Sequence, residues 1–160
     1  LEKLLESKER EEVLRCANDT FRELMLSFSS LGEREGILER ILRFIRSQSP
    51  DSLKTSQICT ALAMSRSLVS KELKEDYGLT LKELIQRFRI QEALRLLTFT
   101  DMKVGAIAHE VGFSDQSYFT KVFKRYTSLT PKLFRRDPVR NYRLLSDTLY
   151  LGGSRGKEKR

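Results

Sequence analysis

Hydroxyl, amide and basic side chains form two clusters about 50 residues apart. The ten candidate binding residues are Arg66, Ser67, Ser70, Lys71 and Lys74 in the first cluster, and Gln116, Ser117, Tyr118, Lys121 and Lys124 in the second. Small and amide groups of this kind can hydrogen-bond to base edges in a major groove, and lysine or arginine can reach guanine acceptors or phosphates. Both clusters therefore favour binding of a polyanion over catalysis.

Residues that could support catalysis or hold a metal are scarce. The chain has one histidine, His109, and two cysteines, Cys16 and Cys59, among its 160 residues. One histidine and two scattered thiols make neither a zinc site nor a nucleophile pair. We therefore expect a protein that is not an enzyme and that holds no metal or cofactor. The thiols are interpreted as free and buried, and His109 as a surface residue.

Charge is distributed unevenly along the chain, whose formal net charge is +8. Residues 1–36 carry a net charge of −3, whereas residues 37–160 carry +11. A basic body favours a polyanionic partner, although charge alone fits duplex DNA, RNA or a lipid surface. No stretch approaches the roughly 18 apolar residues that a membrane helix needs, and the charged start does not resemble a signal peptide. These features predict a cytoplasmic protein without a membrane segment.

Apolar residues at helical spacing run through most of the chain, and strand-like alternation never lasts more than a few residues. This pattern predicts an all-α protein. The expected apolar seams lie within residues 14–31, 37–45, 53–62, 68–73, 84–97, 104–111, 119–126 and 133–134. Residues expected to cap or end helices are Asp51 or Ser52, Ser65, Gly78, Thr80 with Glu83, Ser114, and Thr130 before Pro131.

Two of the expected helix pairs repeat each other. The segment Ile58-x3-Leu62-Ala63-Met64-Ser65 matches Ile107-x3-Val111-Gly112-Phe113-Ser114 at an offset of 49 residues, and the helices that follow match at an offset of 50. The added residue indicates that the second turn is longer by one. A short helix, a tight turn and a second helix with a basic outer face are the outline of a helix-turn-helix.

Apolar positions predict which side of each second helix faces the core. The residues expected to face inward are Leu68, Val69 and Leu73 in the first unit, and Phe119, Val122 and Phe123 in the second. Phe88, Phe99 and Phe113 also lie at core spacing. Two solvated amphipathic helices in an ordinary all-α protein are the alternative interpretation, and the matching basic positions of the two units weigh against it.

The second unit contains a longer signature. Residues 104–134, VGAIAHEVGFSDQSYFTKVFKRYTSLTPKLF, resemble the signature of the AraC/XylS family of bacterial transcription regulators. The matching positions are Ile107-Ala108-x3-Gly112-Phe113, Phe119, Phe123-Lys124 and Thr130-Pro131. The resemblance extends back to about Ile37 and covers roughly 100 of the 160 residues.

This resemblance implies two helix-turn-helix subdomains joined by one long linker helix, at about Thr80–Phe99. It also implies recognition helices at about residues 65–77 and 115–126, which enter successive major grooves of duplex DNA. The base-reading positions that it implies are Ser67, Ser70 and Lys71 in the first subdomain, and Ser117, Tyr118 and Lys121, with Gln116 beside them, in the second. Because the first subdomain diverges more and offers short serines, its specificity is expected to depend on Arg66 and Lys71.

The expected function is therefore sequence-specific DNA binding by a transcription regulator. We expect an acidic helical leader at 1–36, a DNA-binding domain at 37–137 and a basic mobile tail at 138–160. The leader and the absence of an initiator methionine favour a piece of a longer polypeptide. Expected partners are double-stranded DNA, RNA polymerase and, through the leader or a missing N-terminal domain, a second copy of the chain.

Two other function classes are compatible with parts of the sequence. One is a co-regulator that binds a protein partner and has only weak affinity for DNA, which the charge of residues 37–160 disfavours. The other is cysteine-dependent alkyl transfer to DNA, which needs an activated thiol in a basic and exposed setting. Cys59 lies instead between Ile58 and Leu62 on a helix expected to face the core.

Overall fold

The computed structural model describes residues 36–141, and every regular element within this range is an α-helix. The helices are α2 (Ile37–Arg46), α3 (Thr55–Ala61), α4 (Arg66–Tyr77), α5 (Leu81–Phe99), α6 (Val104–Glu110), α7 (Gln116–Thr127) and α8 (Pro131–Arg136). The all-α prediction is confirmed. The expected leader helix with Cys16, and the tail beyond residue 141, lie outside the described residues.

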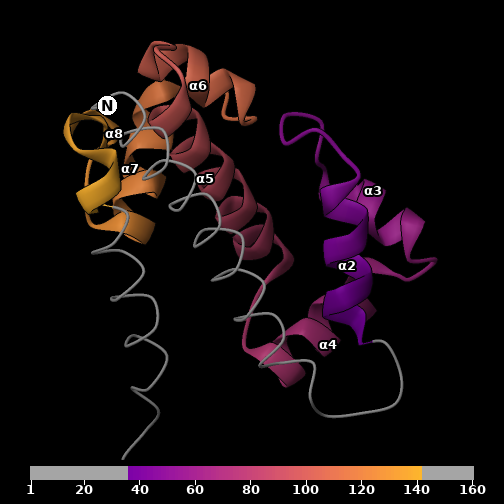
Figure 1. Cartoon of the computed structure of the whole chain (residues 1–160). Helices are drawn as coiled ribbons and strands as arrows, with labels where there is room; N and C mark the ends of the chain where they lie inside the picture. Colours follow the sequence, from indigo (N-terminus) through magenta and orange to yellow (C-terminus); the bar gives the residue numbers. More distant parts are fainter. Residues whose placement is uncertain (1–35, 142–160) are drawn as a thin grey trace, which may run out of the picture.

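Two apolar cores divide the described chain, and α5 contributes to both of them. Its first turns place Leu81, Leu84 and Ile85 in a core with α2, α3 and α4. Its later turns place Ile90, Ala93, Leu96 and Leu97 in a second core with α6, α7 and α8. Figure 1 shows these two groups of helices at opposite ends of α5. The predicted arrangement of two subdomains joined by one linker helix is therefore confirmed.

The start of α5 is set by a reciprocal capping box, as the sequence predicts. The backbone N–H of Thr80 donates to the Glu83 carboxylate at 2.9 Å, and the N–H of Glu83 donates to the Thr80 hydroxyl at 3.2 Å. The preceding helix α4 ends at Gly78, whose φ of +64° lies in the left-handed region that glycine enters without strain. These two signals separate α4 from α5 by three residues.

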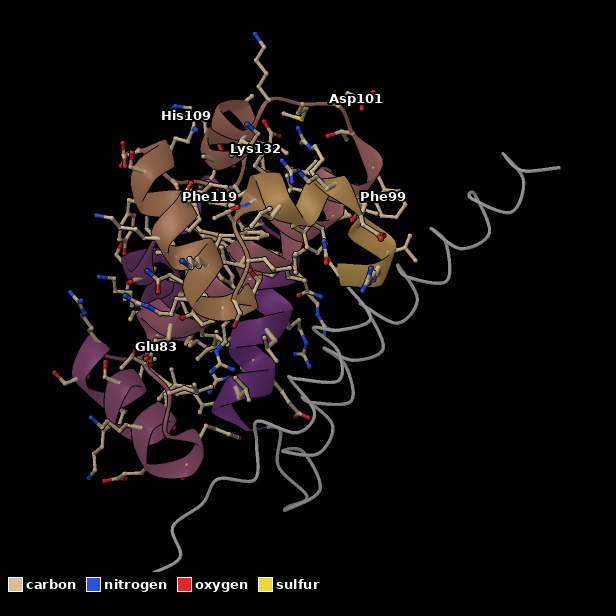
Figure 2. All side chains as sticks on the ribbon, turned by 90° about the vertical axis from the view of Figure 1, so that its left-hand side faces the viewer. Glu83, Phe99, Asp101, His109, Phe119 and Lys132 are labelled. Carbon is tan, nitrogen blue, oxygen red and sulfur yellow. The ribbon has the colours of Figure 1, made fainter. Side chains whose placement is uncertain are left out.

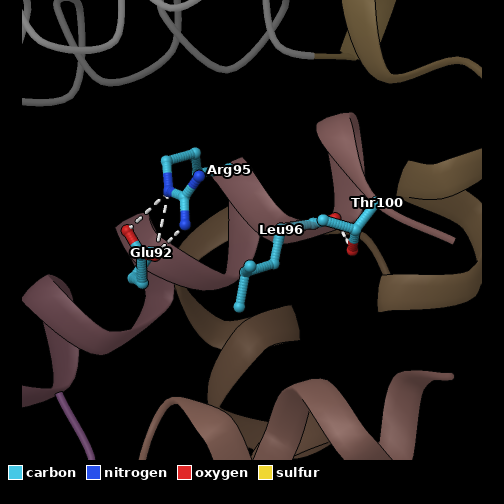
Figure 3. Close-up of polar contacts among 4 residues, drawn as sticks. All are labelled: Glu92, Arg95, Leu96 and Thr100. Carbon is cyan, nitrogen blue, oxygen red and sulfur yellow. Dashed lines mark hydrogen bonds and ion pairs between the residues drawn. The ribbon is translucent and has the colours of Figure 1, made fainter. Parts of the chain in front are cut away.

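Polar contacts near the end of α5 are local to that helix. Arg95 and Glu92 form an ion pair at 2.6 Å, and the Thr100 hydroxyl donates to the carbonyl of Leu96 at 2.7 Å (Figure 3). Phe99, which spacing placed in the core, is only half-buried and lies at the edge of the second subdomain (Figure 2). It is the last residue of α5, so its side chain extends beyond the packed turns.

Two predicted caps were wrong. Helix α3 begins at Thr55, not after Asp51 or Ser52, because Ser52 closes a turn onto the carbonyl of Ser49 with both its N–H and its hydroxyl. Helix α7 is capped by Asp115 instead of Ser114, and the Asp115 carboxylate accepts the N–H of Tyr118. The extra residue in the second turn moves the cap position by one. The predicted caps at Ser65 and Thr130 are confirmed.

The first residues of the predicted tail are helical. Residues 138–141 form a helical turn, in which the N–H of Arg140 donates to the Asp137 carboxylate at 3.1 Å. The Asn141 amide donates to the carbonyls of Leu133 and Phe134, both at 3.2 Å. This turn is thus tied to α8, and the remainder of the predicted tail lies outside the described residues.

Candidate nucleic-acid interface

Each helix pair is joined by a turn that contains one residue with positive φ. Ala63 has a φ of +53° and Gly112 a φ of +87°, and the two residues are equivalent in the internal repeat. In the first unit, α4 follows the cap residue Ser65, whereas in the second unit α7 follows Asp115. The turn is therefore longer by one residue in the second unit, as predicted, and both units have the helix-turn-helix geometry.

Aromatic packing holds α7 against its subdomain. Phe119 and Phe123 are fully buried, and their ring centroids lie 5.7 Å apart. The Phe119 ring also meets Phe113 edge-on at 5.3 Å, and the Phe123 ring meets Phe134 at 6.0 Å. Figure 2 shows Phe119 inside the group formed by α5, α7 and α8. On α4 the equivalent positions are Val69 and Leu73, which are also fully buried.

The outer faces of α4 and α7 present the predicted binding residues to solvent. All ten are exposed: Arg66, Ser67, Ser70, Lys71, Lys74, Gln116, Ser117, Tyr118, Lys121 and Lys124. They lie on the helix that follows the turn in each unit, which is the recognition helix of a helix-turn-helix. The contacts of these residues with DNA stay a prediction.

Leu68 was wrongly predicted to face the core. Its side chain is 43% exposed, close to the 42% of Tyr118, which occupies the equivalent position in α7. Val69 and Leu73 already fill the inward stripe of α4, so the adjacent position is turned outward. The offset of 50 residues between the two helices could have revealed this. An exposed leucine beside Ser67 can make apolar contact with a thymine methyl group.

The two recognition helices differ in charge. Three basic residues of α4, Arg66, Lys71 and Lys74, are balanced by the acidic residues Glu72, Glu75 and Asp76. The basic residues of α7 are Lys121, Lys124 and Arg125, and no acidic residue lies in that helix. Arg125 is exposed, occupies the position equivalent to Glu75, and was missed by the sequence analysis. Electrostatic attraction for phosphate is therefore concentrated on α7.

A polar network connects α7 to the linker helix. The amide of Gln86, in α5, is only 7% exposed and donates to the Tyr118 hydroxyl at 2.9 Å. The hydroxyl of Tyr126 donates to Oε1 of the same side-chain amide at 3.4 Å. The Arg87 guanidinium lies 5.8 Å from the Tyr126 ring centroid. Burial raises the pKa of Tyr126 above its ordinary value. Both tyrosine hydroxyls thus anchor α7 to α5.

The residues that could support other chemistry are dispersed. His109 lies at the surface of α6 (Figure 2), and Cys59 is half-buried against the first core. Within residues 36–141, no group of three or more histidine, cysteine or acidic residues could hold a metal ion. None of the helices in that range is long and apolar enough to span a membrane.

Comparisons with known proteins agree with this geometry. A family model described as a helix-turn-helix domain matches residues 58–137. The Msm operon regulatory protein of Streptococcus mutans is 32% identical over 104 residues, which make up 65% of this chain and 37% of that protein. The chain spans less than half the length of the curated relatives it matches here.

Solved structures show the same fold. The C-terminal domain of the response regulator yesN from Fusobacterium nucleatum is 32% identical, with a TM-score of 0.55 over 61% of this chain and 95% of that one. The DNA-binding domain of AdpA, solved in complex with a target DNA, shares the fold at 19% identity, with a TM-score of 0.57 over 65% of this chain and 98% of that one. Together with the paired helix-turn-helix units, these matches show that the chain belongs to the AraC/XylS family of transcription regulators.

Proposed function

We propose that this chain is the DNA-binding part of a transcription regulator that recognises a specific duplex sequence through α4 and α7. The observation that supports this most is the pair of exposed polar faces on two equivalent recognition helices, connected by the single linker helix α5. The AdpA domain, which shares this fold, was solved with DNA. The protein acts in the cytoplasm and is not an enzyme.

The two recognition helices have different roles in this proposal. Gln116, Ser117 and Tyr118 lie at the start of α7, where polar side chains can meet base edges, and Lys121 and Lys124 follow one and two turns later. In α4 the serines at 67 and 70 are short, so specificity there depends on Arg66, Lys71 and the exposed Leu68. Contacts with RNA polymerase, and self-association through residues 1–36 or a domain beyond this chain, complete the proposal.

The first test is a titration of the chain against duplex DNA at several salt concentrations. The DNA is a duplex selected from a random library for binding to this chain. If about five to eight phosphates are contacted, log K should fall with log salt at a slope of roughly −5 to −7. A slope near zero, or equal affinity for an unrelated duplex, would contradict specific recognition and favour a co-regulator that binds a protein partner.

Single substitutions then test the two recognition helices. Lys121→Ala and Lys71→Ala should each weaken specific binding by about 1–3 kcal/mol if the lysine contacts a base, and by less if it contacts only phosphate. Lys132→Ala, which replaces an exposed lysine of α8, is the matched control and should leave specific affinity nearly unchanged. Should Lys71→Ala leave affinity unchanged while Lys121→Ala abolishes it, the model with two docked helices fails for this protein.

A further inference from the structure

Arg89, in the middle of α5, connects the two subdomains through three separate contacts. Its Nε donates to the carbonyl of Pro50 and its Nη2 to the carbonyl of Leu53, both at 3.1 Å. Both acceptors belong to the loop between α2 and α3, in the first subdomain. The guanidinium carbon lies 5.7 Å from the ring centroid of Phe113, which is part of the second core.

The turn of the second subdomain meets the first subdomain at the same place. A Cβ atom on Gly112 would lie 2.8 Å from the Arg89 guanidinium and 2.8 Å from the Cα of Asp51. The guanidinium could move aside, but the backbone at Asp51 belongs to a loop anchored by the buried Leu53. Gly112 also has a φ of +87°, so an L side chain there would be strained as well.

Arg89 lies between the two apolar cores, and its contacts join a loop of the first subdomain to a ring of the second core. Ile85 is the last buried α5 residue of the first core and Ile90 is the first of the second core, so the boundary between the cores falls between these two residues. The planar guanidinium of Arg89 lies at this boundary. Its orientation is set by the two carbonyl groups that accept its hydrogen bonds and by the Phe113 ring. Burial lowers the pKa of Arg89 and the charge of Asp51 opposes this, and the guanidinium remains charged.

We propose that Arg89 and Gly112 are positioning residues that hold α4 and α7 in one fixed relative orientation before DNA is bound. The junction is formed by the Pro50–Leu53 loop, the Arg89 fork and the Gly112–Phe113 turn. Recognition of two half-sites then needs no reorientation of the subdomains. The entropy cost of orienting the second helix is incurred during folding and not on DNA binding.

The first experiment measures the orientation without DNA. Spin labels are placed on exposed positions of α4 and α7, at Glu75→Cys and Arg125→Cys, in a chain with Cys16→Ser and Cys59→Ala. Double electron–electron resonance spectroscopy, which measures the distance between the two labels, should give one narrow distance distribution for the parent chain. Arg89→Ala, Arg89→Lys and Gly112→Ala should each broaden or shift it. Lysine retains the charge but not the planar fork, so it should not restore the narrow distribution.

Arg95→Ala is the matched control for these variants. Arg95 lies on the same helix, but its ion pair is with Glu92 of α5 and does not reach the first subdomain. The distribution should stay narrow in this variant. Distributions that stay unchanged in both Arg89→Ala and Gly112→Ala would overturn the proposal, even if both variants melt at a lower temperature, because a merely stabilising role predicts lower stability without reorientation.

The second experiment rests on the proposed function and uses DNA in which the two half-sites are moved apart or together by one base pair. The parent chain should prefer one spacing, and Arg89→Ala should lose about tenfold or more in affinity at that spacing while its preference flattens. Affinity for a duplex with a single half-site should change little. If the parent chain shows no preference for one spacing, the proposal that two helices dock on DNA is wrong. If Arg89→Ala keeps the spacing preference of the parent chain, the proposed role of Arg89 is wrong.

Discussion

The hydroxyl of Tyr118, an exposed residue of the recognition helix α7, accepts a hydrogen bond from the buried amide of Gln86 in the linker helix at 2.9 Å. Tyr118 therefore has two roles, and its position in the sequence indicates only the one at the exposed face of α7. Its oxygen fixes the helix to α5, and its own proton remains available to donate to an acceptor on DNA.

Replacement of Tyr118 by phenylalanine should lower both stability and DNA affinity. The ring is retained, but the Gln86 amide loses an acceptor while it stays buried, which should cost about 1–3 kcal/mol of unfolding free energy. Urea denaturation measures this loss. Tyr126→Phe is the control, because its bond to the same amide is longer, at 3.4 Å, and its loss should cost less. Equal stability of Tyr118→Phe and the parent chain would contradict the anchoring role.

Reversal of the charge at position 75 should strengthen binding by the first subdomain. Glu75 occupies the position of Arg125 in the repeat, and both are exposed. Glu75→Arg should increase affinity for duplex DNA and make the salt slope steeper by about one for each added phosphate contact. Arg125→Glu should have the opposite effect. The measurement is the salt dependence of the dissociation constant, and equal slopes for all three proteins would refute the placement of position 75 near phosphate.

Relief of strain at Ala63 should stabilise the first turn. Its φ of +53° is unfavourable for an L residue by about 1–2 kcal/mol, whereas glycine adds about 0.5–1 kcal/mol of backbone entropy to the unfolded chain. Ala63→Gly should therefore raise the unfolding free energy by about 0.5 kcal/mol. Ala61→Gly, at the last residue of α3, where the backbone is helical, should instead lower it, by at most about 1 kcal/mol. Thermal denaturation of both variants distinguishes strain from a general effect of glycine.

The capping box of α5 should contribute stability that depends on pH. Hydrogen bonds from the backbone and hydroxyl of Thr80 hold the pKa of Glu83 below its ordinary value. A lowered folded-state pKa stabilises the protein above the ordinary carboxylate range, and this contribution is lost as pH falls through the folded pKa. The stability difference between the parent chain and Glu83→Gln should therefore shrink between pH 7 and pH 3. A difference that does not depend on pH would show that the carboxylate charge plays no part.

Insertion of five base pairs between the half-sites should reduce binding to the level of one subdomain. The 19 residues of α5 span about 28 Å, close to the roughly 34 Å between successive major grooves on one face of DNA. Half a helical turn moves one half-site to the opposite face, and the linker helix cannot follow. Gel-shift titrations with the original and extended sites measure the effect. Undiminished binding to the extended site would mean that the connector bends or that only one unit contacts DNA.

Local signals in the sequence determined the elements and their order. Ser65, Thr80 with Glu83, and Thr130 cap helices because their oxygen atoms accept backbone N–H groups only a few residues away. Gly78 ends α4 because a left-handed residue is cheapest as glycine. The repeat of Ile58–Ser65 in residues 107–114 predicted both turns. These caps and turns form through interactions between residues only a few positions apart, so they can be predicted from the sequence without knowledge of distant contacts.

Tertiary structure alone decided how the two units face each other and which polar groups serve that purpose. Arg89 contacts carbonyls 36 and 39 residues away, and Gln86 contacts hydroxyls 32 and 40 residues away, so no spacing rule within a helix indicates their partners. Leu68 has the hydrophobicity of a core residue, and it is exposed because Val69 and Leu73 occupy the inward face. Periodicity identifies the apolar positions of a helix, whereas their burial depends on which face of the helix packs against its neighbours in three dimensions.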